Sequence, residues 1–413
     1  MSEFFSSRWI APPADCTEHP TAELPAGFVA GAVAAAVKGG EAPDVSVLLC
    51  LSPAVSSAAR FCDSGVLAAP VLICQRECEL GAIRAVIANS GNANAATGDA
   101  GLEQALHVQI AAANALAIEP REVAVASTGV IGVQLPGERI AMALEGVARK
   151  LDRAGADAFA AAIRTTDRLD KHVSLALELP SGTVNLSAQC KGAGMISPRF
   201  ATMLCFVQTD AAISTELADR LLGASVKQSF DLVSVDGQLS TNDTALLMAS
   251  GASGVAIEPG SEDEYRFAAA LDAVLRQLAL LMVADGEGAK RVGRIEVTGG
   301  DAGVTEQVAR QIANSPLVKA ALFGGDPNWG RIAQAVGAAL PGQAPLRFDI
   351  AIEAIPVCAA GAALAFDQQA LARAVQRDEV EYAVTLPGGG NRTELFFSDL
   401  SYEYVKINAE YTT

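Results

Sequence analysis

The stretch KGAGMISPRFATMLCFVQTDA, residues 191–211, leads from one apolar strand into the next through a loop with two glycines and a proline. Just before it, TVNLSAQC (183–190) alternates between apolar and polar residues, as a half-buried strand does. HVSLALELP (172–180) precedes that strand across the turn Ser181-Gly182, which predicts a β-hairpin. MLCFVQTDA (203–211) then predicts a third strand directly after the loop.

Strand-like and helical segments interleave on both sides of this hairpin. Short apolar runs bounded by turn residues predict strands at 45–51, 70–74, 83–89 and 122–128, and strand-rich segments follow at 346–354, 379–387 and 395–411. Helical spacing of apolar residues predicts helices at 103–118, 138–151, 215–229, 264–283 and 304–314. The pattern as a whole predicts an α+β protein of layered sheets with helices outside them.

The length of 413 residues suggests two or three domains. The sequence contains no low-complexity linker and no internal repeat, but its pattern changes after Gly286. We therefore place a boundary near residue 290. It divides the chain into a core domain, 1–290, and a C-terminal α+β domain, 291–413.

Composition and charge narrow the class of protein. Apolar residues make up 51% of the chain, which does not suit a disordered protein. The apolar run FVAGAVAAAV (28–37) is too short to cross a bilayer, and the first residues lack the pattern of a signal peptide. The net charge of −17 repels phosphate backbones, which argues against nucleic acid as a partner. We expect a soluble cytoplasmic protein that binds neither nucleic acid nor membrane.

Cysteine and histidine limit the chemistry. A chain without a signal peptide is expected to keep its eight thiols reduced. Only Cys74 and Cys78 are close in sequence, and no second pair or nearby histidine completes a metal site. The three histidines, His19, His107 and His172, have no evident catalytic partner. We expect no metal and no cofactor.

The bond between Ala201 and Thr202 offers a chemistry that needs no histidine. If it breaks, the new α-amine of Thr202, with a pKa of about 8, stands beside the threonine hydroxyl and acts as its base. Such self-cleavage is an N-to-O acyl shift followed by hydrolysis, and it needs a strained loop with a small residue before the nucleophile. Gly192, Gly194 and Pro198 are compatible with that loop. Taken alone, a threonine at a strand start is most often structural.

Acyl chemistry also needs donors for the oxyanion. In ASTGVIG (126–132), Thr128 can offer a hydroxyl and Gly129 a backbone N–H without side-chain obstruction. NSGNANAATG (89–98) is another polar, glycine-rich turn after a strand, suited to lining a pocket. Read in isolation, both segments are more often simple turns at strand ends.

Eight segments together resemble the ornithine acetyltransferase family, also known as the bifunctional glutamate N-acetyltransferases of the arginine pathway. They come in the family's order and span roughly residues 25 to 413. In chain order they are NSGNANAATG (89–98), ASTGVIG (126–132), TTD (165–167), KGAGMISPRFATM (191–203), VDGQLSTNDT (235–244), DGEGA (285–289), DPNWGRI (326–332) and NAEYTT (408–413).

The resemblance implies a self-processed enzyme. Cleavage between Ala201 and Thr202 is expected to give an α chain (1–201) and a β chain (202–413), with Thr202 as the nucleophile. Thr128 and Gly129 match the family's oxyanion hole. The positions that match its substrate contacts are Thr165 or Thr166, Lys191, Thr202, Glu287, Asn408 and Thr413.

The family reaction is ping-pong: the threonine takes acetyl from N-acetylornithine and passes it to glutamate. Some members also accept acetyl from acetyl-CoA, which makes acetyl-CoA a candidate substrate. Lys191 can hold a substrate carboxylate and Glu287 can attract the amine of an ornithine-like substrate. On spacing alone, a structural ion pair or a solvated surface is the commoner role for both residues.

The resemblance also implies a fold and an assembly. The fold is a sandwich of sheets and helices like that of DmpA and the ornithine acetyltransferases, with a smaller C-terminal α+β domain. The tail NAEYTT of that domain returns to the active site. The two cleaved chains assemble as an α2β2 tetramer.

The chain departs from the family pattern in several segments. The cleavage loop carries Arg199 and Phe200, VDGQLSTND carries Gln238 and Leu239, and DGEGA is followed by Lys290. NAATG and the TTD segment also differ from the usual pattern. We hypothesise that the added charges of Arg199 and Lys290 near the site shift the acyl donor or acceptor away from ornithine.

Two other functions stay open on the sequence. An N-terminal-threonine amidase or aminopeptidase would give the acyl group to water, and dependence on an acceptor would separate it from a transferase. An uncleaved, catalytically idle homologue would act by binding, and it would remain a single chain under denaturing conditions.

Overall fold

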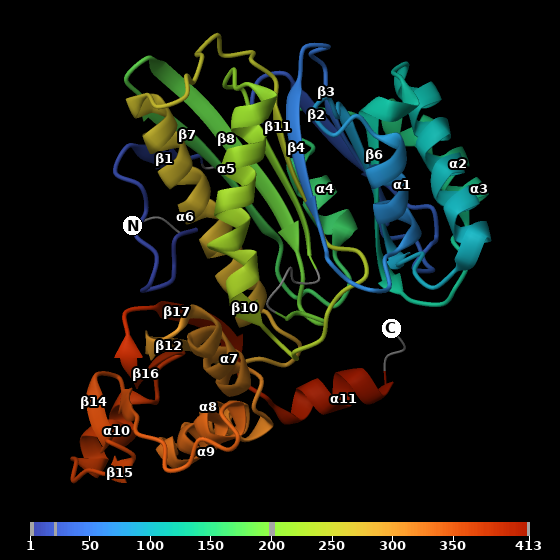
Figure 1. The fold of residues 1–413 in the computed structure, drawn as a ribbon. Helices are drawn as coiled ribbons and strands as arrows, with labels where there is room; N and C mark the ends of the chain where they lie inside the picture. Colours follow the sequence, from blue (N-terminus) through green and yellow to red (C-terminus); the bar gives the residue numbers. More distant parts are fainter. Residues whose placement is uncertain (1–3, 20–22, 198–202, 411–413) are drawn as a thin grey trace.

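The computed structural model describes residues 4–19, 23–197 and 203–410 (Figure 1). Their strands form a six-stranded sheet of order β1-β7-β8-β9-β11-β4, a four-stranded sheet of order β2-β3-β5-β6 and a seven-stranded sheet further along the chain. Figure 1 shows the first two sheets side by side, with helices on the outer face of each, while one helix, α4 (Ala156–Ile163), contacts both sheets. The predicted α+β class and layered sandwich are confirmed.

The opening stretch forms the centre of the six-stranded sheet. β7 (Lys171–Leu179) and β8 (Gly182–Lys191) pair as the predicted antiparallel hairpin, and β9 (Leu204–Thr209) pairs antiparallel to β8. The register places Lys191 opposite Leu204. The two ends of the loop that carries the predicted cleavage bond are therefore adjacent in the sheet.

Alternation along the central strands divides the apolar side chains between two cores. In β9, Cys205 and Val207 face one core while Leu204 and Phe206 face the other. The first core lies against the helices α5 and α6, and the second lies against the four-stranded sheet. Because side chains alternate between the two faces of a strand, this one segment contributes to both cores. The remaining strands of this sheet are β1 (Cys16–Glu18), β4 (Ser56–Phe61) and β11 (Thr244–Ala249).

The four-stranded sheet has two parallel neighbours, β5 (Ala85–Asn92) and β6 (Val123–Val130). Helix α2 (Gly98–Leu116) connects them, so both strands end at the same edge of the sheet. The other elements of this layer are β2 (Phe28–Val33), β3 (Val45–Cys50), α1 (Ala69–Glu77), α3 (Gly137–Ala148) and α4 (Ala156–Ile163).

On the opposite side, α5 (Thr215–Lys227) and α6 (Glu262–Ala284) cover the six-stranded sheet (Figure 1). Helix α6 begins at a cap in which the Ser261 hydroxyl accepts from the Glu264 N–H. It is the one helix of the described residues that is long and apolar enough to cross a membrane. Most of its apolar residues are buried against the sheet, as in the core helix of a globular domain.

The seven-stranded sheet has a core of its own. Its first strand, β10 (Val233–Ser234), comes from the middle of the chain and pairs parallel to β17 (Arg392–Ser398). The domain boundary near residue 290 stays a prediction. The other elements are β12 (Val292–Gly300), β13 (Asp349–Ile352), β14 (Ile355–Ala359), β15 (Ala362–Ala363), β16 (Glu379–Gly389), α7 (Ala302–Ala313), α8 (Pro316–Gly324), α9 (Trp329–Ala339) and α10 (Gln368–Ala374).

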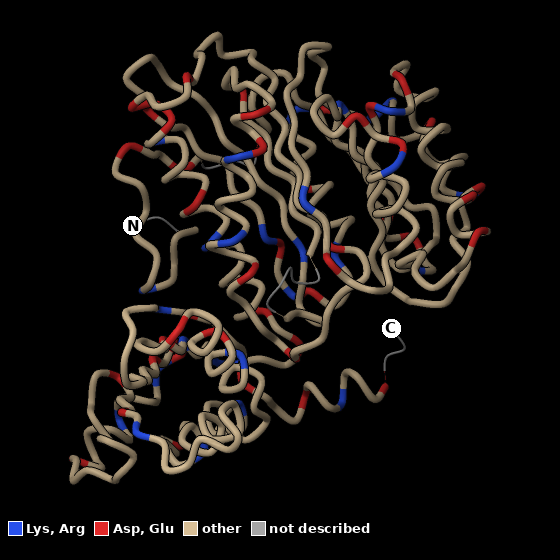
Figure 2. Tube along the Cα trace, viewed as in Figure 1, with Lys and Arg blue, Asp and Glu red and all other residues tan. Residues whose placement is uncertain are grey.

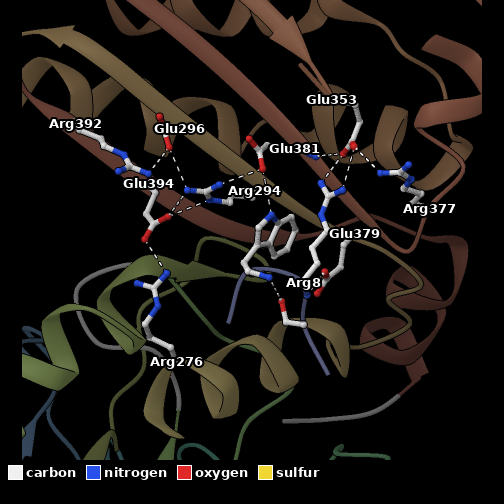
Figure 3. A network of polar contacts seen from close by, with 12 residues as sticks. Arg8, Arg276, Arg294, Glu296, Glu353, Arg377, Glu379, Glu381, Arg392 and Glu394 are labelled. Atoms are coloured by element: carbon white, nitrogen blue, oxygen red, sulfur yellow. Dashed lines mark hydrogen bonds and ion pairs between the residues drawn. The ribbon is translucent and has the colours of Figure 1, made fainter. Parts of the chain in front are cut away.

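A network of arginines and glutamates joins this sheet to the rest of the chain (Figure 3). Arg294 of β12 contacts three carboxylates, those of Glu296, Glu381 and Glu394. Glu394 is shared with Arg276 of α6 at 2.8 Å. At the N-terminal end, Arg8 binds both carboxylate oxygens of Glu353, which lies between β13 and β14, at 3.0 and 2.6 Å.

Two predicted strands are wrong. Residues 70–74 lie in α1, where Pro70 occupies the first turn, a position that favours a helix over a strand. The predicted strand 395–411 ends with β17 at Ser398, and α11 (Tyr402–Glu410) follows. Ser401 accepts from the Tyr404 N–H and so starts this helix. Figure 1 shows α11 leaving the C-terminal sheet and running along the underside of the core layers.

Candidate active site

A cavity of about 140 Å³ lies where β6 and β8 end and where α11 crosses back to the core. Seven of the residues predicted for the site line it. They are Thr128, Gly129, Thr165, Thr166, Lys191, Glu287 and Asn408. Segments far apart in the sequence therefore meet around one small space, as the resemblance implied.

The other predicted site residues, Ala201, Thr202 and Thr413, lie outside the described residues. Lys191 and Met203, which flank the cleavage loop, are described and buried. Self-cleavage and the role of Thr202 therefore stay predictions.

The Thr128-Gly129 pair sits at an irregular end of β6. The pairing of β5 with β6 shifts between Gly91 and Asn92, opposite this pair. Gly129 has a φ of +134°, and a Cβ added there would lie 2.4 Å from the carbonyl carbon of Gly91. Only glycine fits this position, and its presence leaves the backbone unobstructed beside the cavity.

Asn242 joins the ends of β5 and β6, a role that the sequence did not reveal. Its side-chain amide donates to the carbonyl oxygens of Ala93 and Ser127 at 2.6 and 2.8 Å. It belongs to VDGQLSTNDT, a segment of the family pattern in which the sequence assigns no role to Asn242. The bond to Ser127 fixes the residue before Thr128.

Lys191 ends β8 and is buried, with 2% of its surface exposed. Its ammonium group donates to the hydroxyls of Thr165 at 2.9 Å and Thr128 at 3.2 Å. Asp167 lies 3.8 Å away. Burial lowers the pKa of Lys191, and the nearby Asp167 carboxylate opposes that shift.

A second buried lysine lies behind the first. Lys171 contacts Asp167 at 2.8 Å and Asp285 at 2.6 Å. Burial works against the charge on Asp167, but Lys191 and Lys171 outweigh it and hold the pKa of that carboxyl below its usual range. Figure 2 shows basic and acidic residues side by side at this end of the central strands.

Glu287 lines the cavity from the segment that follows α6. Its N–H donates to the Ala193 carbonyl at 2.8 Å, which ties it to the loop after β8. Its carboxylate accepts a bond of 2.7 Å from the Asn408 amide. A Cβ at Gly194 would come within 2.7 Å of the carboxylate, so glycine makes room for it.

Helix α11 brings two polar side chains to the cavity, Tyr404 and Asn408. Burial, with Asp236 and Glu287 nearby, raises the pKa of Tyr404 to about 12, so its hydroxyl stays protonated at neutral pH. Asn408 is the one residue of the described part of the tail (408–410) that lines the cavity, and the return of the tail to an active site stays a prediction.

Asp236 and Asp243 hold the two sides of the cleavage loop, and sequence reasoning missed both. Asp236 accepts from the N–H groups of Met195 at 2.6 Å and Ile196 at 3.0 Å. Asp243 is fully buried and accepts from the Met203 N–H at 2.9 Å. Burial raises the pKa of both carboxyls. The sequence feature that could have indicated these two residues is the pair of aspartates in VDGQLSTND, flanked by small residues.

The residues that depart from the family pattern do not all reach the cavity. Gln238 lines it, whereas Leu239 is 48% exposed and is not among the described lining residues. The side chain of Lys290 lies over the ring of Phe323, 5.3 Å from its centroid. Lys290 is not among the described residues that line the cavity, and its effect on the acyl donor or acceptor stays a prediction. Arg199 lies outside the described residues.

The cysteines are free thiols in the structure. Burial raises the pKa of several, that of Cys62 to about 12, which keeps them protonated and unreactive. Among the described residues, no three His, Cys, Asp or Glu side chains form a group that could hold a metal ion.

Comparison with known proteins places the chain in a family. The ArgJ family matches residues 29–413. The arginine biosynthesis bifunctional protein ArgJ of Symbiobacterium thermophilum is 41% identical over 392 residues, covering 94% of this chain and 98% of the relative. Its counterpart in Geobacter sulfurreducens is 42% identical over 396 residues, covering 94% and 99%.

Two solved structures are also similar. ArgJ of Bacillus halodurans is 35% identical, with a TM-score of 0.47, and the match covers 50% of this chain and 98% of that one. The ornithine acetyltransferase of Mycobacterium tuberculosis, solved with ornithine, is 34% identical, with a TM-score of 0.41, and covers 46% and 100%. The family match and the curated relatives confirm what the eight segments predicted: this chain belongs to the ArgJ family.

Proposed function

We propose that this protein is a self-processed acetyltransferase of arginine biosynthesis that moves acetyl from N-acetylornithine to glutamate through an acetyl ester of Thr202. One observation carries the proposal: a single cavity is lined by the Thr128-Gly129 pair, by Lys191 and by Glu287. It combines donors for an oxyanion with opposite charges for an amino-acid substrate.

In the first half-reaction, the α-amine of Thr202 takes the proton of the threonine hydroxyl. The hydroxyl oxygen attacks the acetyl carbonyl carbon of N-acetylornithine. The C–N bond breaks, ornithine leaves with the proton on its nitrogen, and the acetyl ester remains.

In the second half-reaction, the amine of glutamate attacks the ester carbonyl. The C–O bond breaks, a proton returns to the threonine oxygen, and N-acetylglutamate leaves. Reuse of one cavity by donor and acceptor in turn is what a ping-pong reaction requires.

Both half-reactions place negative charge on the carbonyl oxygen. The Thr128 hydroxyl accepts a bond from Lys191, so its own proton is free to donate to that oxyanion. The Gly129 N–H is the second donor. Preorganised donors of this kind are worth about 10²–10³ in rate each.

Charge at the two ends of the cavity supports the choice of substrate. Lys191 suits a carboxylate, which both substrates carry, and Glu287 with Asn408 suits the side-chain amine that N-acetylornithine carries. The volume of about 140 Å³ is smaller than the sites of drug-sized ligands and suits a small metabolite.

The same proposal covers the cofactor requirement, the assembly and the cellular location of the enzyme. The enzyme works without a metal or a bound cofactor, with acetyl-CoA as a candidate alternative donor. The cleaved chains form an α2β2 tetramer in the cytoplasm. These points rest on family membership.

Intact mass under denaturing conditions tests the processing step. Two wild-type fragments that meet at Ala201 and Thr202, with one uncut chain for Thr202→Ala, are expected. Acetyl transfer from N-acetylornithine to isotope-labelled glutamate tests the reaction. Release of free acetate at the same rate without glutamate would instead identify an amidase, and an uncut, inactive wild type would identify a binding protein.

A further inference from the structure

We propose that Lys171, which lies outside the cavity, is a positioning residue. It fixes the carboxylate-binding Lys191 and the amine-binding Glu287 relative to each other. This inference rests on the proposed function, since it assigns those two residues to the two ends of the substrate. Lys171 is not one of the described residues that line the cavity. Any effect it has on the substrate must therefore act through its neighbours.

Lys171 begins β7 and is 1% exposed. Its ammonium group lies 2.8 Å from Asp167 Oδ1 and 2.6 Å from Asp285 Oδ2, and both carboxylates are fully buried. A buried lysine with two carboxylates is a satisfied ion cluster rather than a solvated surface charge. It joins two segments that are more than 100 residues apart.

On one side, Asp167 fixes the surroundings of Lys191. Its carboxylate accepts from the Gly192 N–H at 2.7 Å and from the Thr165 N–H at 3.2 Å. Gly192 follows Lys191, and Thr165 accepts the hydrogen bond of the Lys191 ammonium group. The position of Asp167 therefore sets where the Lys191 side chain is held.

On the other side, Asp285 fixes the start of the segment that carries Glu287. It accepts from the N–H groups of Arg168 at 3.0 Å and Leu169 at 3.3 Å. Glu287 lies two residues further on and donates its N–H to Ala193. Lys171 is thus the charged link between the segment of Asp167 and the segment of Asp285.

The charges explain why the link needs a lysine. Asp167 and Asp285 both touch one ammonium group, so without it two buried carboxylates would face each other and repel. The guanidinium of Arg168 also reaches Asp285, but its side chain is 57% exposed and screened by water.

Lys171 also acts on the titration of Lys191. Groups whose charge bears on Lys191 are Asp167, Lys171, Cys190, Asp243 and Lys38. Lys171 lowers the pKa of Lys191 by repulsion, while Asp167, which the two lysines share, raises it. Removing Lys171 removes the repulsion and leaves Asp167 to Lys191 alone, so both effects raise the pKa of Lys191.

The test compares Lys171→Met with Lys227→Met, which removes an exposed lysine at the end of α5. Self-cleavage is checked first by intact mass, and kcat and KM are then measured for N-acetylornithine and for glutamate. For Lys171→Met we expect kcat/KM to fall on the order of 10- to 100-fold for both substrates, mainly through KM. The alkaline limb of its pH profile moves to higher pH, and Lys227→Met matches the wild type.

Asp285→Asn tests the positioning of Glu287 while it keeps Lys171 and the effect of Lys171 on the pKa of Lys191. It is also the variant to use if Lys171→Met does not fold. It weakens the link to Glu287 but keeps the contact between Lys171 and Asp167. We expect a larger rise in KM for N-acetylornithine than for glutamate, with the alkaline limb unmoved. Equal KM values for wild type and both variants, or a loss of thermal stability with unchanged KM, would overturn the inference.

Calorimetric titration with ornithine and with glutamate keeps the two proposals apart. Wild-type protein that binds both ligands but transfers no acetyl group would refute the proposed function. The weaker binding expected for Lys171→Met would still support the positioning role in that case, and unchanged binding would refute it.

Discussion

The ammonium group of Lys191 donates a 3.2 Å hydrogen bond to the hydroxyl of Thr128. The bond occupies one acceptor site of the hydroxyl and leaves its proton available to a group in the cavity. It also couples two roles that the sequence suggested separately, the binding of a substrate carboxylate and the stabilisation of an oxyanion. A positive charge behind the donor makes its proton a stronger partner for developing negative charge.

We therefore expect Thr128→Val to lower kcat about 10²–10³-fold, because one oxyanion donor is lost. KM changes little, since the oxyanion exists only in the transition state. Steady-state kinetics with N-acetylornithine and glutamate measure both constants. Thr128→Ser keeps the hydroxyl and should recover most of the rate, and Thr183→Val, an exposed threonine of β8, should have no effect. A slow Thr128→Ser variant would show that the methyl group, not the hydroxyl, matters.

Gly129→Ala tests the backbone geometry of the same pair. The added Cβ would lie 2.4 Å from a backbone carbon of Gly91, and the φ of +134° is unfavourable for alanine. We expect a loss of about 1–3 kcal/mol in the free energy of unfolding together with most of the activity. Chemical denaturation measures the first and initial rates the second.

Gly132→Ala is the matched control for that prediction. Gly132 also has a positive φ, +80°, but nothing lies within 4 Å of an added Cβ. Its cost is limited to the backbone conformation, about 1 kcal/mol, and activity should persist. Similar losses in both variants would mean that the contact with β5 is not what constrains Gly129.

Motifs and alternation predicted much of this molecule. The hairpin of β7 and β8 followed from the alternation of TVNLSAQ and a Ser-Gly turn. The register of β9, which places Leu204 opposite Lys191 on the other edge of β8, is visible only in the structure. Thr128 and Gly129 are candidates from their own segment, whereas five lining residues followed only from the resemblance: Thr165, Thr166, Lys191, Glu287 and Asn408. Their meeting at one cavity depends on tertiary packing of all three sheets.

Two features could not be predicted from the sequence, each for its own reason. The first is the secondary structure of residues 70–74, which suit a strand and a helix equally well. PVLIC (70–74) is as apolar and as short as a strand, and only Pro70 in its first turn marked a helix. The buried cluster of Lys171, Asp167 and Asp285 was hidden for a different reason. Charged residues are usually exposed, and only the fold shows that these three are covered.

Lys319 of α8 should make stability depend on pH. It is buried, donates to the carbonyl of Ser398, and its pKa falls to about 7 because burial disfavours its charge. Between pH 7 and the ordinary lysine pKa of about 10.4, the unfolded chain binds a proton that the folded chain lacks. Stability from this residue therefore rises with pH across that window, by about 1.4 kcal/mol per pH unit at most.

Lys319→Met should flatten that slope. Denaturation midpoints at pH 7, 8, 9 and 10 for the wild type, Lys319→Met and the exposed-lysine control Lys227→Met provide the measurement. The wild type and Lys227→Met should share one slope, and Lys319→Met should lack the rise. An identical slope in all three proteins would place the titration elsewhere.

Arg294 should be the most costly residue of the network in Figure 3 to remove. Its guanidinium, 14% exposed, contacts Glu296, Glu381 and Glu394, so Arg294→Met leaves three neighbouring carboxylates without their shared cation. Glu394 keeps Arg276 and Glu296 keeps Arg392, whereas Glu381 loses its arginine. We therefore expect a loss of about 1–3 kcal/mol in the free energy of unfolding. Arg266→Met breaks exposed pairs with Asp15 and Glu262 and should change stability little. High salt should restore part of the stability of Arg294→Met by screening the repulsion between the carboxylates. Equal stabilities of Arg294→Met and Arg266→Met would show that the ion pairs of Arg294 contribute no more than exposed ones.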